Sequence, residues 1–169
     1  MLDLNIQSQL EQIPDYFRAT QKELLLASKR ALIRTTKWVK THASREVAKA
    51  SNIPLKTLKG RIYGSCKTKR MRGTVWVGLN KISPKYIGAK QNEQGVTAGQ
   101  WTFPKSFIVD SKGGHVFRRT TKARFPISKQ MIDFTAKAQS RLEAKIEPMI
   151  QKRFFLELER QLQWAISRR

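Results

Sequence analysis

Residues 15–50 read DYFRATQKELLLASKRALIRTTKWVKTHASREVAKA, the longest stretch of helical periodicity in the chain, without proline or glycine. Its apolar residues recur every seven positions in two adjacent rows, so they form one stripe along a helix. At about 1.5 Å per residue, this helix would be about 54 Å long, more than one small sheet covers. The stripe is therefore expected to cover a sheet or, in part, to contact a neighbouring subunit. The rows are Phe17, Leu24, Ala31 and Trp38, and beside them Leu25, Leu32 and Val39.

Both ends of this helix carry sequence signals. Asp15 follows Pro14, which predicts that the helix starts here with Asp15 as its N-cap. At the other end, Asn52 is placed to take the left-handed conformation that ends many helices, and Pro54 blocks continuation. A second, short helix is expected over residues 55–62.

From Thr74 onward the apolar residues alternate every second position, which is typical of β-strands. Glycine and proline separate the runs, so we expect a small, mostly antiparallel sheet. The predicted strands are residues 74–79, 86–89, 94–99, 106–109 and 115–119, and residues 124–127 close the region.

The last part of the chain is predicted to be helical again. Residues 131–138 suggest a short helix, and residues 147–167 suggest a final helix that packs beside the N-terminal one. Phe155 and Trp164 lie off the apolar stripe of this helix. Together with Trp38 they are candidates for a subunit interface.

These elements predict an α+β fold: a small, mostly antiparallel sheet, a long N-terminal helix across one face, and a C-terminal helix. A chain of 169 residues can bury a core as one domain without disulfides, so we expect a single domain over residues 1–169. Its parts are an N-terminal strand of residues 2–6, a helical turn to Ile13 and helices within residues 1–63, the β region of residues 74–128, and the C-terminal helices of residues 129–169.

The charge of the chain is strongly positive. It has 34 Lys and Arg residues against 12 Asp and Glu, a formal net charge of +22, so a polyanion such as nucleic acid is the expected partner. Residues 64–73, bounded by glycines, are expected to form a flexible basic loop, either a solvated hairpin tip or a site of phosphate contact. The candidates for phosphate contact are Lys67, Lys69, Arg70, Arg72, Arg118, Arg119, Lys122 and Arg124.

The junction after the long helix resembles the helix-turn-helix of bacterial repressors. Ala48, Asn52, Ile53, Leu58 and Ile62 fall at the expected spacing. However, that motif has a short first helix, whereas here it would be the last third of a long one. Thr57 and its neighbours would read DNA in this alternative, and a simple helix corner is the other interpretation.

Catalysis, metal binding and cofactors have little support in the sequence. Glu93, Asp110 and Lys112 imitate a nuclease pattern but lack the usual further acid. The chain has one cysteine, Cys66, and two histidines, His42 and His115. It can therefore form no internal disulfide, and these residues do not have the spacing of metal ligands. With these weak patterns we expect neither an enzyme nor a bound cofactor. No signal peptide or membrane-length apolar run is present, so we expect a soluble protein made in the cytoplasm.

Several short motifs follow one another between Ala27 and Ile127 at consistent separations. They are the basic, alanine-containing helix, Asn52-Ile53-Pro54, Trp76 to Asn80, Tyr86 to Gln91, Gly95-Val96, Phe107-Ile108, Gly114 to Arg119 and Phe125-Pro126-Ile127. Their succession resembles the bacteriophage minor tail protein Z family, the tail-completion proteins of phages and prophages. Lys90 stands where such proteins more often have arginine, which keeps the charge.

The resemblance implies a structural virion protein, without enzymatic activity, at the head-proximal end of the tail and made in the host cytoplasm. Expected partners are other tail and neck proteins, including the tail terminator and tail tube, and further copies of the chain in a ring around the DNA channel. The basic candidates would then face DNA without reading its sequence, or would pair with acidic protein neighbours.

Overall fold

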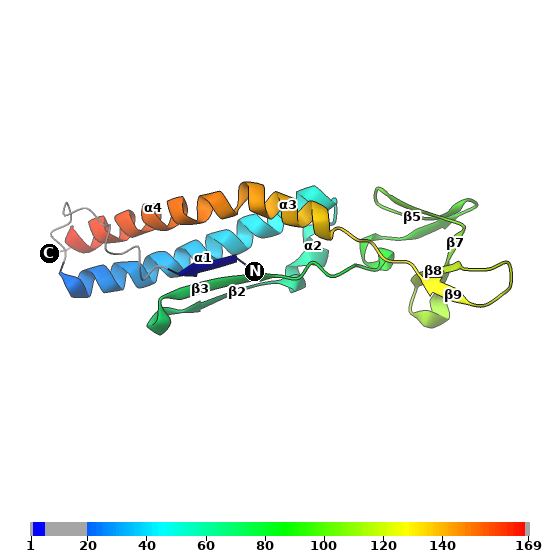
Figure 1. Ribbon diagram of the computed structural model, residues 1–169, viewed down its shortest axis with the longest axis horizontal. Helices are drawn as coiled ribbons and strands as arrows, with labels where there is room; N and C mark the ends of the chain where they lie inside the picture. The colour runs from blue at the N-terminus through cyan, green and yellow to red at the C-terminus, as the bar shows by residue number, and fades with distance from the viewer. Residues whose placement is uncertain (1, 6–19, 168–169) are drawn as a thin grey trace.

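The computed structural model describes residues 2–5 and 20–167 (Figure 1). A body of long helices and one hairpin occupies one end of the elongated molecule, and a lobe of short strands occupies the other. The helices are α1 (Gln21–Ser51), α2 (Leu55–Leu58), α3 (Thr135–Lys145) and α4 (Glu147–Ile166). The strands are β1 (Leu2–Asn5), β2 (Ile62–Lys67), β3 (Arg72–Val77), β4 (Lys90–Asn92), β5 (Gly95–Ala98), β6 (Trp101–Pro104), β7 (Ser106–Val109), β8 (His115–Arg119) and β9 (Ile127–Lys129).

Helix α1 is the longest element, but it starts later than the sequence predicts. Thr20 is its N-cap: the Thr20 hydroxyl accepts from the Glu23 backbone N–H at 3.4 Å, and the Glu23 carboxylate accepts from the Thr20 N–H at 2.8 Å. This reciprocal capping box satisfies two free donors, so the prediction of a helix start at Asp15 is wrong. Asp15 and the predicted turn to Ile13 lie outside the described residues. The predicted end is confirmed, because Asn52 takes the left-handed conformation with φ 48°.

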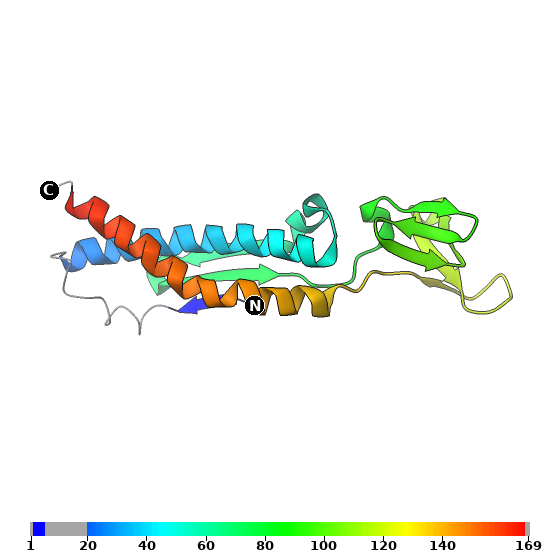
Figure 2. The ribbon, with the colours of Figure 1, turned by 90° about the horizontal axis from the view of Figure 1, so that it is seen from above.

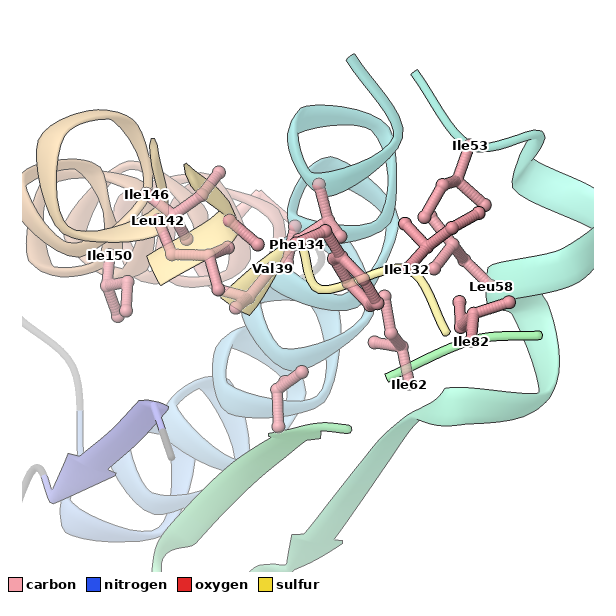
Figure 3. Packing of buried hydrophobic residues seen from close by; sticks show 14 residues of the cluster. Val39, Ile53, Leu58, Ile62, Ile82, Ile132, Phe134, Leu142, Ile146 and Ile150 are labelled. Carbon is pink, nitrogen blue, oxygen red and sulfur yellow. The ribbon is translucent and has the colours of Figure 1, made fainter. Parts of the chain in front are cut away.

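Helices α3 and α4 follow one another and run back along α1 (Figures 1 and 2). Near the start of α1, Leu32 packs against Phe154 and Leu162 of α4. Farther along, a larger core joins α1 and α3 to the hairpin and to the connection with the strand lobe. Figure 3 shows its members, among them Val39, Ile53, Leu58, Ile62, Ile82, Ile132, Phe134, Leu142, Ile146 and Ile150.

The strands of the described residues form three antiparallel sheets of three strands each, rather than the single sheet predicted. The first has the order β1-β3-β2 and lies against α1, whose stripe it therefore covers in part. Its hairpin occupies residues 62–77, so the prediction of a flexible loop over residues 64–73 is wrong except at the tip. The prediction failed because Gly64 and Gly73, which look like loop punctuation, lie where the strands approach α1.

The strand lobe contains the sheets β4-β5-β6 and β7-β8-β9. Two chain segments connect it to the helical body, and Ile82 and Ile132 exchange both backbone hydrogen bonds there, at 3.0 and 2.7 Å. The prediction of a strand at residues 86–89 is wrong, because Pro84 opens a 3₁₀ turn that Gly88 closes in the left-handed conformation. The α+β class, the long first helix and the C-terminal helix are confirmed, and the single domain stays a prediction.

Candidate functional site

The eight basic candidates are all exposed, but the structure places them in two groups. The hairpin group lies around the β2–β3 tip: Lys67, Lys69, Arg70 and Arg72. The lobe group lies on β8 and the segment leading to β9: Arg118, Arg119, Lys122 and Arg124. The hairpin tip belongs to the helical body, whereas the lobe group is at the opposite end of the molecule (Figure 1). Within one chain the two groups therefore form separate surfaces.

The lobe group is held by local contacts. Thr120 closes the segment between β8 and β9, since its N–H and its hydroxyl both donate to the Pro126 carbonyl, at 3.2 and 3.0 Å. Two guanidinium groups lie over aromatic rings, Arg119 over Phe107 at 5.6 Å and Arg124 over its neighbour Phe125 at 5.8 Å. The ring contacts orient the two guanidinium groups. Within residues 2–5 and 20–167, none of the four cations of the lobe group forms an ion pair with an acid.

The three aromatic interface candidates differ in how much surface they offer. Trp38 is partly buried and stacks on His42 with ring centroids 4.3 Å apart. Phe155 is also partly buried and packs on the cluster between α1 and α4. Trp164 is 42% exposed, and the Arg30 guanidinium lies 4.6 Å above its ring. Of the three, Trp164 presents the largest surface to a neighbouring molecule.

A buried carboxylate, which the sequence analysis did not single out, organises the contact between α1 and α4. Glu157 is only 3% exposed, and one of its oxygens accepts from Arg153 at 2.5 Å. Guanidinium nitrogens of Arg34 and Arg160 lie 3.7 and 3.6 Å from the carboxylate. The sequence could have shown that Arg153 and Arg160 lie beside Glu157, because they are spaced four and three residues from it on one helix. The approach of Arg34 depends on the fold, because Arg34 is on α1.

The helix-turn-helix interpretation finds no recognition helix. α2 is a single turn of four residues, followed by a 3₁₀ turn and then β2, so the predicted helix over residues 55–62 is too long. Ile53 and Leu58 are buried as core residues, and the Thr57 hydroxyl donates to the Tyr86 carbonyl at 3.0 Å. A one-turn helix of this kind cannot fill a major groove as the second helix of that motif does.

The residues with the nuclease-like pattern lie in turns of the strand lobe. Glu93 is in the turn between β4 and β5, and Asp110 and Lys112 belong to a 3₁₀ turn after β7. In the described part of the chain, no three His, Cys, Asp or Glu side chains gather as a metal site would require. The pattern therefore has no supporting cluster.

The thiol and the two imidazoles are on different elements, β2, α1 and β8. Burial raises the pKa of the Cys66 thiol, which keeps it protonated and weakly nucleophilic. Burial, with nearby cations, lowers the pKa of His42 and of His115. Nδ1 of His115 is 2.7 Å from the hydroxyl of Ser83, which ties η4, the 3₁₀ turn Pro84–Ile87, to β8.

The family model described as prophage minor tail protein Z matches residues 15–168 of this chain. The protein belongs to this family. No curated protein and no solved structure matches it.

As a member of the minor tail protein Z family, the protein is a phage minor tail protein associated with the virion. The family is one of structural phage tail proteins, which are generally non-enzymatic. Among the helices of the described residues, none is long and apolar enough to cross a membrane. Membership of the family suggests interaction with other phage tail proteins.

Proposed function

We propose that this protein completes the head-proximal end of the tail as a ring of identical subunits around the DNA channel. The observation that carries the proposal is the match to the minor tail protein Z family over residues 15–168. The elongated shape supports it, because neighbouring subunits in a ring could contact along the helical body while the strand lobe reaches another layer of the tail (Figure 2).

The subunit interface in this proposal includes Trp164, with Trp38 and Phe155 as further candidates that are partly buried. Trp164 lines a groove of about 640 Å³ between α1 and α4 together with Arg30, and exposed aromatic and arginine side chains are enriched at protein interfaces. Phe155 and Trp38 pack within the chain, so changing them would also disturb the fold. Trp164→Gln is therefore the cleaner test of the interface.

The two basic groups have separate roles in this proposal. The hairpin group and the lobe group are at opposite ends of the subunit, so a ring would place them at different heights along the channel (Figure 1). Each group meets the phosphates of the passing DNA without reading its bases. Acidic surfaces of the tail terminator or tail tube are the alternative partners for these cations.

The test is to locate the protein in particles. A phage that carries a tagged copy would be labelled with gold beads and imaged, and the beads should lie where tail and head join. Cryo-electron microscopy of the same particles should show a closed ring at that level. Trp164→Gln should reduce incorporation while the purified variant stays folded by circular dichroism. Label at the distal tip, or a single copy per tail, would overturn the proposal.

A further inference from the structure

A third basic surface lies between α1 and α2, apart from the hairpin and lobe groups. It is a groove of about 550 Å³ in the helical body. Five cationic side chains line it, three from α1 and two from the α2 corner: Lys37, Lys40, Arg45, Lys56 and Lys59. All five are exposed.

These five cations have no acid to neutralise them. No carboxylate lines the groove, and within residues 2–5 and 20–167 none of the five forms an ion pair. Glu46 follows Arg45 in sequence, but its carboxylate accepts from Arg141 at 2.7 Å and lies 3.6 Å from the Lys49 ammonium. The positive charge of the groove is therefore left for a bound anion.

The neighbouring groove between α1 and α4 shows the contrast. Lys37 lines both grooves, but in the second one Arg34 and Arg160 lie beside the buried carboxylate of Glu157. Those arginines balance the buried negative charge of Glu157. The cations of the α1–α2 groove balance no buried carboxylate, so a requirement of folding does not explain their presence.

We propose that the α1–α2 groove binds the phosphate backbone of duplex DNA without reading its sequence. Leu55, 46% exposed, is the one large apolar side chain on its wall, whereas the centre of a protein interface is usually apolar and poor in charge. Protein–DNA interfaces are more polar and much more positively charged. The composition of the groove therefore favours nucleic acid over an acidic protein.

The polar groups of the groove also explain why base reading is absent. The hydroxyls of Thr41 and Ser44 donate to backbone carbonyls of their own helix, at 3.0 and 2.7 Å. α2 is too short to enter a major groove, and the Thr57 hydroxyl is bound to Tyr86. Charged side chains on flexible stems remain, and these contact phosphates regardless of base sequence.

The test uses the purified full chain and a short fluorescent duplex of mixed sequence, with binding measured by anisotropy over a series of salt concentrations. The groove variant carries Lys37→Gln, Lys40→Gln, Arg45→Gln, Lys56→Gln and Lys59→Gln. The control variant carries five exposed lysines changed to glutamine elsewhere, at Lys22, Lys90, Lys105, Lys145 and Lys152, so both lose the same charge. Circular dichroism checks that both are folded.

The groove variant should bind at least about tenfold more weakly than the control, and its log–log salt slope should fall by up to about 4.5, since each lost phosphate contact contributes about 0.9. Duplexes of unrelated sequence should compete equally. Equal losses in both variants would mean that only total charge matters and would overturn the proposal. So would a groove variant that binds DNA normally but fails to enter tails, because the groove would then take an acidic protein. Neither result depends on where in the tail the protein lies.

Discussion

Gly73 lies where strand β3 approaches α1 too closely for a larger side chain. A methyl group on its Cα would collide with the Thr36 hydroxyl and lie 3.1 Å from a Leu32 methyl carbon. That hydroxyl is fixed, because it donates to the Leu32 carbonyl at 2.8 Å in the buried interior. Gly73→Ala should therefore lower the free energy of unfolding by about 2 kcal/mol, as overpacking of a core does. Urea denaturation measures the difference.

Gly64 on the neighbouring strand is the matched control. A methyl group there would make ordinary contacts, with the nearest Lys40 carbon at 3.5 Å. Gly64→Ala should leave the free energy of unfolding within about 0.5 kcal/mol of the parent, or raise it slightly by restricting the unfolded chain. If both alanines cost the same, the close approach of β3 to α1 is not the cause.

At the scale of elements, the start of α1 can be tested with Thr20. Thr20→Ala removes the hydroxyl of the capping box and should lower the free energy of unfolding by about 1 kcal/mol. If the helix began at Asp15 instead, position 20 would be a helix interior, where alanine is the better helix former. Urea denaturation distinguishes the two possible starts of the helix. An unchanged or higher free energy of unfolding for Thr20→Ala would support the start at Asp15.

The exposed Thr41 of the same helix is the control for this change. Its hydroxyl donates to the Lys37 carbonyl four residues back, a bond that adds little to a helix already hydrogen-bonded there. Thr41→Ala should leave stability unchanged or raise it by a few tenths of a kcal/mol.

The contact between α1 and α3 should make stability depend on pH. The hydrogen bond from Arg141 is the main cause that lowers the pKa of Glu46 below its ordinary value of 4.5. The stabilisation that this lowered pKa gives is present above about pH 4.5, where the Glu46 carboxylate is charged in both the folded and the unfolded protein. It is lost as the pH falls through the pKa of Glu46 in the folded protein. The midpoint temperature of thermal unfolding should therefore fall less steeply between pH 5 and pH 3 for Glu46→Gln than for the parent. Parallel curves for the two proteins would contradict this prediction.

Sequence patterns predicted those elements whose signals are local. The end of α1 at Asn52 and the strands around Val96, Phe107 and Val116 are marked by their own residues. The hairpin of β2 and β3 was partly missed because its side toward α1 includes glycines, which give no apolar alternation. The approach of Arg34 to Glu157 and the α1–α2 groove could not be predicted, because both combine residues that only the fold brings together.

At the scale of the whole molecule, the hairpin group can be tested in particles. The variant Lys67→Gln, Lys69→Gln and Arg70→Gln leaves Arg72 in place, since Arg72 makes contacts within the chain. If the group faces DNA, tails should form in normal numbers, infection per particle should fall, and the in vitro salt slope should drop by up to about 2.7.

Counting full particles by electron microscopy against plaque titre separates the two partners of the hairpin group. Tails that fail to form would assign the hairpin cations to an acidic neighbouring protein instead. A variant with three lysines of the groove control changed, Lys22→Gln, Lys90→Gln and Lys152→Gln, loses the same charge and shows the effect of lower charge alone.

The chain enters and leaves the strand lobe side by side, where Ile82 and Ile132 are hydrogen-bonded to each other. The segment between them is therefore equivalent in topology to an insertion, because its two ends are hydrogen-bonded to each other. Such a segment can lengthen, shorten or be exchanged for another small module without moving β3 or α3. Host-specific variation among related phages should therefore accumulate between residues 84 and 130, while the helical body stays constant in length.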